Sequence, residues 1–151
     1  MQIERDVSKA TQIRPSVSVV ILNERGELLL QRRSDNGQWG LPGGSVEIGE
    51  SVMGATVREV REEIGLLVEV VRLVGVYSDP KLQVVRYPDG RVVHFINTCF
   101  ECRVVGGQLQ TCPETLGLAY FEPAALPHML VPLHQIRIAD ALRRQATATI
   151  R

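Results

Sequence analysis

Three glutamates lie close together near the middle of the chain, within the segment GSVEIGESVMGATVREVREEIGL, residues 44–66. Glu59, Glu62 and Glu63 are three and four positions apart, so on a helix they occupy neighbouring places on one surface. Carboxylates crowded in this way repel one another unless a positive group lies among them. Carboxylate oxygens are also the ligands that Mg²⁺ and Mn²⁺ prefer. The spacing therefore indicates a divalent-cation site.

The helix that carries these glutamates is predicted to run from Glu50 or Ser51 to Ile64, with Gly65 placed to stop it. The glutamates fall in its C-terminal half, where the helix dipole disfavours anions, so a plain solvated acidic face explains them poorly. They are expected to project away from an apolar stripe that faces a core. The residues of that predicted stripe are Met53, Val57, Val60 and Ile64.

The residues before the helix, Leu41-Pro42-Gly43-Gly44, let the backbone turn tightly and approach a ligand closely. A backbone carbonyl there can complete the oxygen shell of a cation. Oxygen ligands that leave room for water suit metal-assisted attack on a phosphate, which needs charge neutralisation, an oriented diphosphate and an activated water.

Residues 44–66 match the signature of the Nudix hydrolase superfamily at every defined position, and Gln38-Trp39-Gly40-Leu41-Pro42-Gly43 is similar to the family's approach to that signature. The resemblance implies an α/β fold with a mixed β-sheet sandwiched between α-helices, as a single domain over residues 1–151. It implies hydrolysis of a diphosphate linkage in a nucleoside diphosphate derivative, with Mg²⁺ or Mn²⁺ as cofactor. A pyrophosphohydrolase is therefore expected.

The resemblance also implies roles for several residues in and next to this segment. The metal ligands would be Gly43, through its carbonyl, Glu59, Glu62 and Glu63. Arg58 would pair with a glutamate and orient it, a role that suits the planar and always-charged guanidinium group of arginine. Gly44 and Glu50 would support the loop and the ligands. Glu62, Glu63 and Arg58 are expected to be catalytic.

Candidates outside the segment are less specific. The general base differs among family members, and Glu114 is a candidate because it precedes Tyr120-Phe121 as a family loop glutamate precedes an aromatic pair. The alternative is an exposed loop acid, and Glu101 is a second candidate base. Arg32 is the candidate phosphate-binding residue; the next residue, Arg33, should face the other way in a strand, so at most one of them reaches the site.

Other polar and aromatic residues receive structural interpretations. Cys99 and Cys102 lie in a predicted strand and point to opposite faces, so they should not share a metal or a bridge. The three histidines show no ligand spacing and are read as surface or packing residues. Trp39 either stacks on a base or packs under the Pro-Gly-Gly turn, and packing is favoured. The stretch Tyr77–Arg91 either shapes substrate choice or is a plain hairpin.

Alternation and turn residues predict the other elements. Residues 15–22 and 27–33 are predicted to be the two strands of one hairpin. Further strands are expected at 66–77, 92–105 and 118–121, and a second long helix at 133–144.

Composition limits the partners. The chain has 151 residues, with 17 basic and 17 acidic side chains and no net charge, so no global field attracts nucleic acid or membrane. The expected partner is a nucleotide-derived small molecule, and binding to duplex nucleic acid is not expected. The N-terminus lacks the apolar stretch of a signal peptide, and the run 17–22 is too short to span a bilayer, so a cytoplasmic protein is expected. A homodimer is common in the family.

Two questions stay open at this point. Within the enzyme interpretation, a nucleotide sugar such as ADP-ribose competes with a modified nucleoside triphosphate as substrate. RNA 5′-end processing is less favoured because no basic stripe is present. The alternative from another class is a module that senses a nucleotide without cleaving it, although such domains usually lose one of the carboxylates that are present here.

Overall fold

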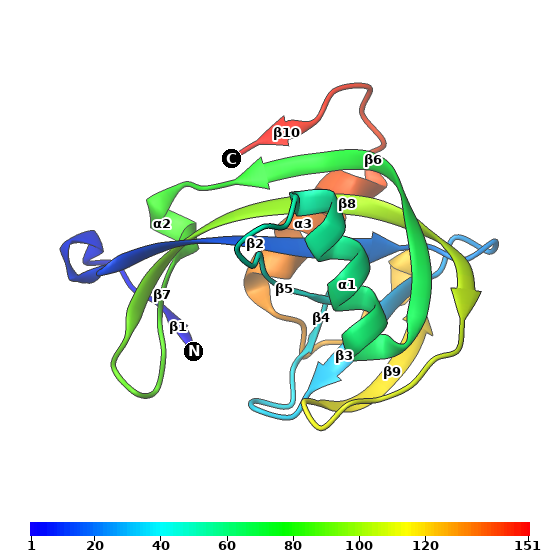
Figure 1. The fold of residues 1–151 in the computed structure, drawn as a ribbon, viewed down its shortest axis with the longest axis horizontal. Coiled ribbons are helices and arrows are strands. Elements are labelled where there is room, and N and C mark those ends of the chain that lie inside the picture. The colour runs from blue at the N-terminus through cyan, green and yellow to red at the C-terminus, as the bar shows by residue number, and fades with distance from the viewer.

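A computed structural model describes the whole chain, residues 1–151. Its strands form two sheets (Figure 1). The larger sheet contains β1 (Gln2–Ile3), β2 (Gln12–Ile21), β5 (Gly43–Ser45), β6 (Leu66–Tyr77), β7 (Val84–Arg86), β8 (Val92–Gly107) and β10 (Thr149–Ile150). The smaller sheet contains β3 (Leu28–Arg33), β4 (Trp39–Gly40) and β9 (Thr115–Phe121). The helices are α1 (Val52–Ile64), α2 (Pro80–Gln83) and α3 (Pro132–Leu142), with short 3₁₀ turns η1 (Val7–Lys9) and η2 (Pro123–Ala125). No helix is both long and apolar enough to cross a membrane.

Strand β8 is the centre of the larger sheet. One of its edges pairs in parallel with β2 over ten residues, from Gln12 opposite Val93 to Ile21 opposite Cys102. Its other edge pairs antiparallel with β7 and then with β6. The far edge of β2 pairs antiparallel with β5, which holds the Gly43-Gly44 loop beside β2. The sheet is therefore mixed, as the sequence predicts.

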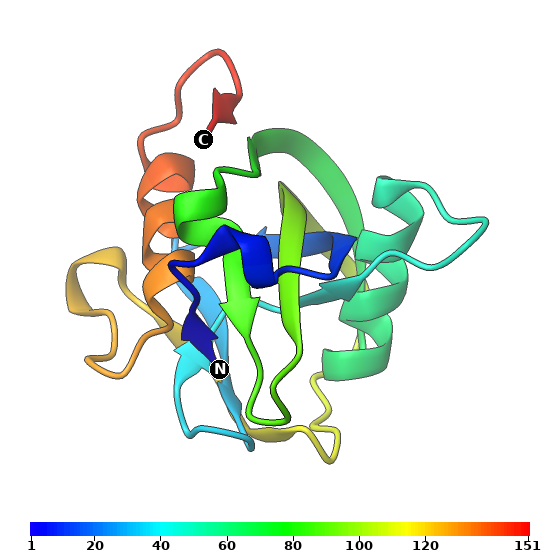
Figure 2. The ribbon, with the colours of Figure 1, turned by 90° about the vertical axis from the view of Figure 1, so that its left-hand side faces the viewer.

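Helices α1 and α3 lie on opposite sides of the larger sheet (Figure 2). Alternate residues of β2 explain this arrangement, because Val19 belongs to the apolar cluster that contains α1 residues and Val20 to the cluster that contains α3 residues. Val60 and Ile64 of α1 pack in the first cluster, and Ile138 of α3 packs in the second. The expected α/β fold, a mixed sheet between helices, is confirmed.

The predicted hairpin of residues 15–22 and 27–33 is wrong. The two strands form, but they belong to different sheets and are joined only by one isolated bridge, between Leu22 and Leu28. Strand β3 pairs with β4 and with the distant β9 instead. The residues between the two strands do form a turn, in which the Gly26 N–H donates to the Asn23 carbonyl, while the pairing partner β9 lies far along the chain.

Helix α1 has the predicted ends but not the predicted inner face. Ser51 caps its first turn by accepting a hydrogen bond from the Gly54 N–H, and Gly65 ends it with a left-handed backbone, φ 77°. Val60 and Ile64 are fully buried, but Met53 and Val57 are 52% and 36% exposed. The buried face is completed by Ala55 and Thr56, so the stripe is rotated and Glu59 and Glu63 flank it rather than point away.

The cysteines of β8 behave as predicted. Cys99 is buried in the cluster beside α3, and Cys102 is buried in the cluster beside α1. All three cysteines of the chain are free thiols. The sheet itself separates Cys99 from Cys102, so the CxxC spacing reflects packing on two faces.

Candidate active site

Arg58 organises the acidic residues of α1. Its guanidinium donates a forked pair of hydrogen bonds to Glu50, through Nε and, at 2.9 Å, through Nη2. Its Nη1 donates to Glu59 at 2.9 Å and to Glu62 at 3.1 Å. Nη2 also donates to the Ser45 carbonyl at 3.0 Å, which ties the helix to the end of β5. The hydrogen bond to Glu50 is the main reason that the pKa of Arg58 is raised.

The two glycines of β5 let the backbone pass between β2 and α1. A methyl group on Gly43 would collide with the Val17 backbone carbonyl, because β5 pairs closely with β2 there. A methyl group on Gly44 would lie 2.5 Å from the Glu59 carboxyl group. Contacts below 3.0 Å require something to move, so only glycine allows Glu59 to lie against this strand.

Glu63 is held beside Glu59 at the inner edge of α1. Its carboxylate accepts a hydrogen bond from the Gln31 amide at 2.9 Å and a longer one from the Gly43 N–H at 3.4 Å. Burial raises the pKa of Glu63 to about 8, and repulsion from Glu59 adds to that rise against the Gln31 hydrogen bond. Burial also raises the pKa of Glu59, although Arg58 opposes it. Negative charge at this pair is therefore costly without a further cation.

These carboxylates open into a cavity of about 320 Å³. Strands β2 and β5, helices α1 and α3, and the α2–β8 region all contribute to its wall, and Glu59 and Glu63 lie on the α1 side. Tyr87 and Phe95 line it from the hairpin between β7 and β8, with ring centroids 6.5 Å apart. The stretch Tyr77–Arg91 thus contains a short helix, a strand and a turn, and it contributes Tyr87 to the cavity.

Of the two arginines at the end of β3, Arg33 rather than the expected Arg32 lines this cavity. Side chains alternate along a strand, so Arg33 shares a face with Gln31, which contacts Glu63. Arg32 is exposed and donates to the Gly37 carbonyl at 3.1 Å. Arg33 forms an ion pair with Asp35 at the rim. Arg33 therefore replaces Arg32 as the candidate phosphate-binding residue.

The two candidate bases outside α1 separate in space. Glu114 is exposed and lines the cavity together with Glu63, so it lies at the rim of the site. Glu101 is buried and pairs with Arg72, which also donates to the Ala141 carbonyl of α3. This contact places Glu101 on the α3 side of the sheet, away from Glu59 and Glu63. Trp39 packs edge-on against Phe121, with ring centroids 5.0 Å apart.

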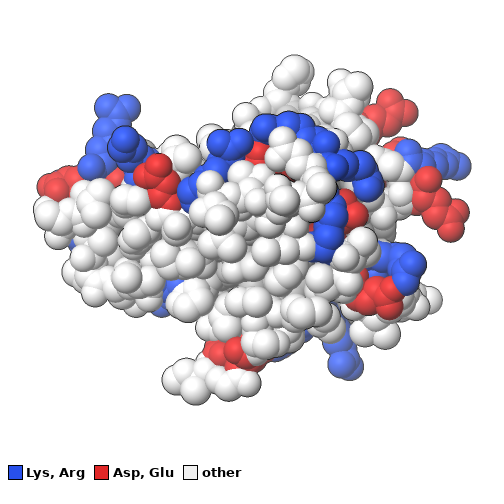
Figure 3. Space-filling view, turned by 90° about the horizontal axis from the view of Figure 1, so that it is seen from above, with Lys and Arg blue, Asp and Glu red and all other residues white.

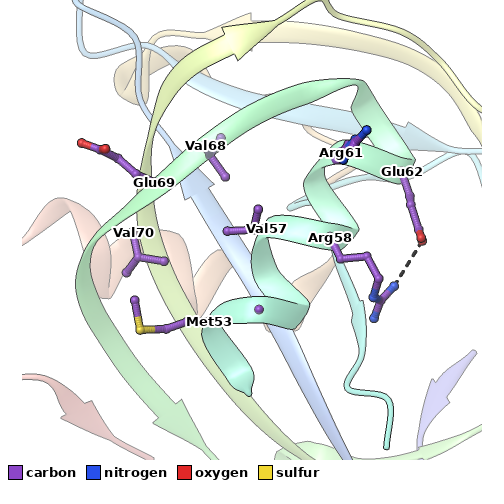
Figure 4. Close-up of a pocket in the computed structure, with 9 residues that line it drawn as sticks. Met53, Val57, Arg58, Arg61, Glu62, Val68, Glu69 and Val70 are labelled. Atoms are coloured by element: carbon purple, nitrogen blue, oxygen red, sulfur yellow. Dashed lines mark hydrogen bonds and ion pairs between the residues drawn. The ribbon is translucent and has the colours of Figure 1, made fainter. Parts of the chain in front are cut away.

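A larger hollow, about 840 Å³, lies on the outer side of α1 (Figure 4). Met53 and Val57 of α1 face Val68 and Val70 of β6 across it, which accounts for the exposure of the first two. Its wall includes Arg58 and Glu62 but neither Glu59 nor Glu63. We therefore assign the chemistry to the smaller cavity, where the buried carboxylates lie.

Comparison with known proteins agrees with this geometry. The family model of the NUDIX domain matches residues 12–144. The chain belongs to the Nudix hydrolase superfamily. It is 37% identical over 145 residues to an ADP-ribose pyrophosphatase of Methanocaldococcus jannaschii, covering 93% of this chain and 81% of that protein. It is 37% identical over 123 residues to a putative 8-oxo-dGTP diphosphatase of Bacillus subtilis, covering 81% of this chain and 75% of that one.

A solved Nudix structure has the same fold. The crystal structure of an ADP-ribose pyrophosphatase from Streptococcus suis superposes with a TM-score of 0.69 at 28% identity, covering 91% of this chain and 97% of the other. The Nudix chain described here is thus a pyrophosphohydrolase of nucleotide derivatives, and the cavity beside Glu59 and Glu63 is its candidate active site.

Nudix hydrolases generally need a divalent metal, and the residues present fit one. Four glutamates, Glu47, Glu50, Glu59 and Glu62, share the single Arg58 guanidinium, and Glu63 adds a fifth carboxylate. The donors are oxygens, which hard cations prefer. No three acidic, histidine or cysteine side chains converge on one point, because Glu62 turns out toward Arg58 and is 61% exposed. Binding a cation through Glu59, Glu62 and Glu63 together (the box glutamates, named for the signature segment 44–66) requires Glu62 to rotate inward.

The Nudix signature did not reveal several residues that line the cavity. Arg33 comes from β3, His134 and Arg137 from α3, and Gln83 from α2, while Gln31 of β3 contacts Glu63 beside the cavity. A signal existed for Arg137, since it lies one turn from Leu133 and one turn from Ala141 on the predicted helix. A charged residue in that position interrupts an apolar face, which is unusual unless the residue has a partner or a function.

The raised pKa of Glu63 predicts a pH dependence of stability in the metal-free Nudix protein. Between about pH 4.5 and 8 the folded protein keeps a proton at Glu63 that the unfolded chain has released. The unfolded state then binds fewer protons, so the free energy of unfolding falls as pH rises through this window, by at most about 1.4 kcal/mol per pH unit. Chemical denaturation in the presence of a chelator measures this slope.

The variant Glu63→Gln provides the control for that slope. It keeps buried His134, whose lowered pKa acts in the opposite direction below about pH 6.5. The difference between the two proteins should therefore isolate the Glu63 carboxyl group. Equal slopes for wild type and variant between pH 6.5 and 8 would show that Glu63 carries no excess proton in the folded state.

Proposed function

We propose that this Nudix hydrolase cleaves a diphosphate linkage in a nucleoside diphosphate derivative bound between α1 and α3. The observation that carries the proposal is that Glu59, held by Arg58, and its neighbour Glu63 line a cavity whose wall also contains the rings of Tyr87 and Phe95. Carboxylates suit the cation and phosphate end of such a substrate, and an aromatic wall suits a base. The products are a nucleoside monophosphate and a phosphorylated fragment, or pyrophosphate if the substrate is a triphosphate.

The roles within the site follow from chemistry and position. Glu59, Glu62, Glu63 and the Gly43 carbonyl hold Mg²⁺ or Mn²⁺, which when bound supplies charge neutralisation at the diphosphate. Arg58 and Glu50 keep the α1 glutamates oriented, and Gly44 gives Glu59 its space. Arg33 at the rim binds a phosphate oxygen.

Hydrolysis breaks one P–O bond of the linkage while a water oxygen forms a new bond to phosphorus. The proton of that water passes to a carboxylate. Glu62, Glu63 and Glu114 are the candidate acceptors: Glu63 and Glu114 line the cavity, and Glu62 precedes Glu63 on α1 but faces the larger hollow. Glu63 is held most firmly, by Gln31 and Gly43, whereas Glu114 is exposed on its loop.

A substrate panel tests the proposal. Purified protein is incubated with ADP-ribose, other nucleotide sugars, 8-oxo-dGTP and unmodified nucleoside triphosphates, each with Mg²⁺, Mn²⁺ or EDTA. Products of the nucleotide sugars are measured as phosphate after phosphatase treatment, and products of the triphosphates as phosphate after pyrophosphatase treatment. We expect turnover with either metal and its loss in EDTA. Tight ADP-ribose binding with no metal-dependent product from any nucleotide would favour the sensing module instead.

The proposal extends to location and partners. We infer a cytoplasmic enzyme and a homodimer, which cell fractionation and light scattering test. Duplex nucleic acid is not among the inferred partners. In support, acidic and basic groups lie beside one another around a broad uncharged area on the face shown in Figure 3.

A further inference from the structure

Arg137 of α3 is a buried cation in the wall of the active-site cavity, and it has no acidic partner. Its side chain is 5% exposed, and its Nε atom has no hydrogen-bond partner. Its Nη2 donates to the Gln83 side-chain oxygen at 3.1 Å. The nearby Asp140 is already occupied by Tyr77, Arg143 and Arg151. Its guanidinium carbon lies 5.5 Å from the centre of the Tyr77 ring, which offers no hydrogen-bond acceptor of the usual kind. A buried arginine with so few acceptors is costly unless a ligand supplies more.

The groups around Arg137 are also donors. Gln83 gives its oxygen to Arg137, so its amide nitrogen carries two hydrogens with no partner in the protein. His134 accepts the Leu41 N–H through Nδ1 at 2.9 Å, which leaves the proton of a neutral ring on Nε2. Burial lowers the pKa of His134, so the neutral ring persists at physiological pH. This end of the cavity therefore presents hydrogen-bond donors to a ligand.

We propose that Arg137, with Gln83 and His134, reads the nucleobase and selects a 6-oxopurine, a guanine-type base, over a 6-aminopurine. The inference rests on the proposed function, which brings the diphosphate to the glutamates. The base then extends toward α3, past the aromatic rings of Tyr87 and Phe95. A 6-oxopurine presents two adjacent acceptors, O6 and N7, to a forked donor such as arginine. A 6-aminopurine instead presents an amino group to a wall of donors.

The test compares binding of GMP and AMP by calorimetry in EDTA, so that catalysis plays no part. We expect the wild-type protein to bind GMP more tightly, by about 10-fold to 100-fold. The variant Gln83→Glu supplies a carboxylate to Arg137 without removing it, and it should abolish most of that preference. Arg137→Lys should do the same, because an ammonium group lacks the planar fork. Arg143→Gln, an exposed arginine near the end of α3, is the control and should leave the preference unchanged.

Folding and phosphate binding are separated from base recognition by two further measurements. Thermal melting identifies a variant that fails to fold, and Gln83→Glu then decides the question alone, since it is nearly isosteric. Ribose 5-phosphate serves as a probe without a base. A wild type that binds AMP as tightly as GMP would overturn the proposal, as would variants that weaken ribose 5-phosphate as much as GMP. If no nucleotide is hydrolysed but GMP is still preferred, the proposed function fails and the base recognition stands.

Discussion

Glu63→Gln is expected to lower turnover by about 10³-fold or more while the protein keeps its fold. The amide has the shape of the carboxyl group and can still accept the hydrogen bond from Gln31 through its oxygen. It removes the charge that burial and Glu59 oppose, so the metal-free variant should be at least as stable as wild type at pH 8. Steady-state kinetics with Mg²⁺ and thermal melting in EDTA measure the two effects.

Two further variants show whether the loss of turnover is specific to the site. Glu62→Gln should also abolish turnover, although Glu62 is largely exposed and its loss should hardly change stability. Glu69→Gln on β6 is the control, since Glu69 is exposed, pairs with Arg103 and lies outside the cavity. Full activity in both Glu62→Gln and Glu63→Gln would refute the assignment of the site to the box glutamates.

Gly44→Ala is expected to reduce turnover by about 10²-fold with little effect on folding. The added methyl group would lie 2.5 Å from the Glu59 carboxyl group, which is the end of a flexible side chain, so Glu59 moves and the backbone does not. Displacing a catalytic group by about 1 Å costs turnover of this order. The measurements are kcat with saturating Mg²⁺ and the melting temperature.

The matched control is Gly117→Ala in β9, where a methyl group would meet no atom within 4 Å. It should leave both kcat and the melting temperature close to wild type. Gly43→Ala should differ from both, because its methyl group meets the Val17 backbone and strains the pairing of β5 with β2. An unchanged kcat in Gly44→Ala would mean that the position of Glu59 does not limit the reaction.

The core of the site was predictable because its parts are local in sequence. Glu59, Glu62, Glu63 and Arg58 lie within six residues on one helix, so helical spacing alone brings them together. The ends of that helix were predictable too, because Ser51 and Gly65 act through neighbouring backbone groups. Spacing cannot say which side of the helix meets the sheet, and the predicted stripe through Met53 and Val57 was wrong for that reason.

The arginine at the end of β3 shows a second limit. Leu28, Leu29 and Leu30 are all fully buried, so the strand is covered on both faces and its hydrophobic pattern has no alternation. Without alternation the sequence cannot tell whether Arg32 or Arg33 faces α1. The orientation of the two arginines is fixed by the pairing of β3 with β9, which lies far along the chain. The position of Arg137 in the cavity wall could not be predicted either. Its lack of an acidic partner depends on how α2 and α3 pack against each other, which the sequence of neither helix shows.

The walls of the cavity come from parts of the chain that can change independently. Helix α1 supplies Glu59 and Glu63 and β5 supplies the glycines beside them, whereas α3 and the region from α2 to β8 supply the opposite end. On the proposed assignment, we expect mutations in α3 to change which substrate is accepted while Glu59 and Glu63 stay in place. We therefore expect that such a chain can change its substrate in evolution without passing through an inactive intermediate. The same separation makes α3 the place where a designer would begin to redirect the enzyme.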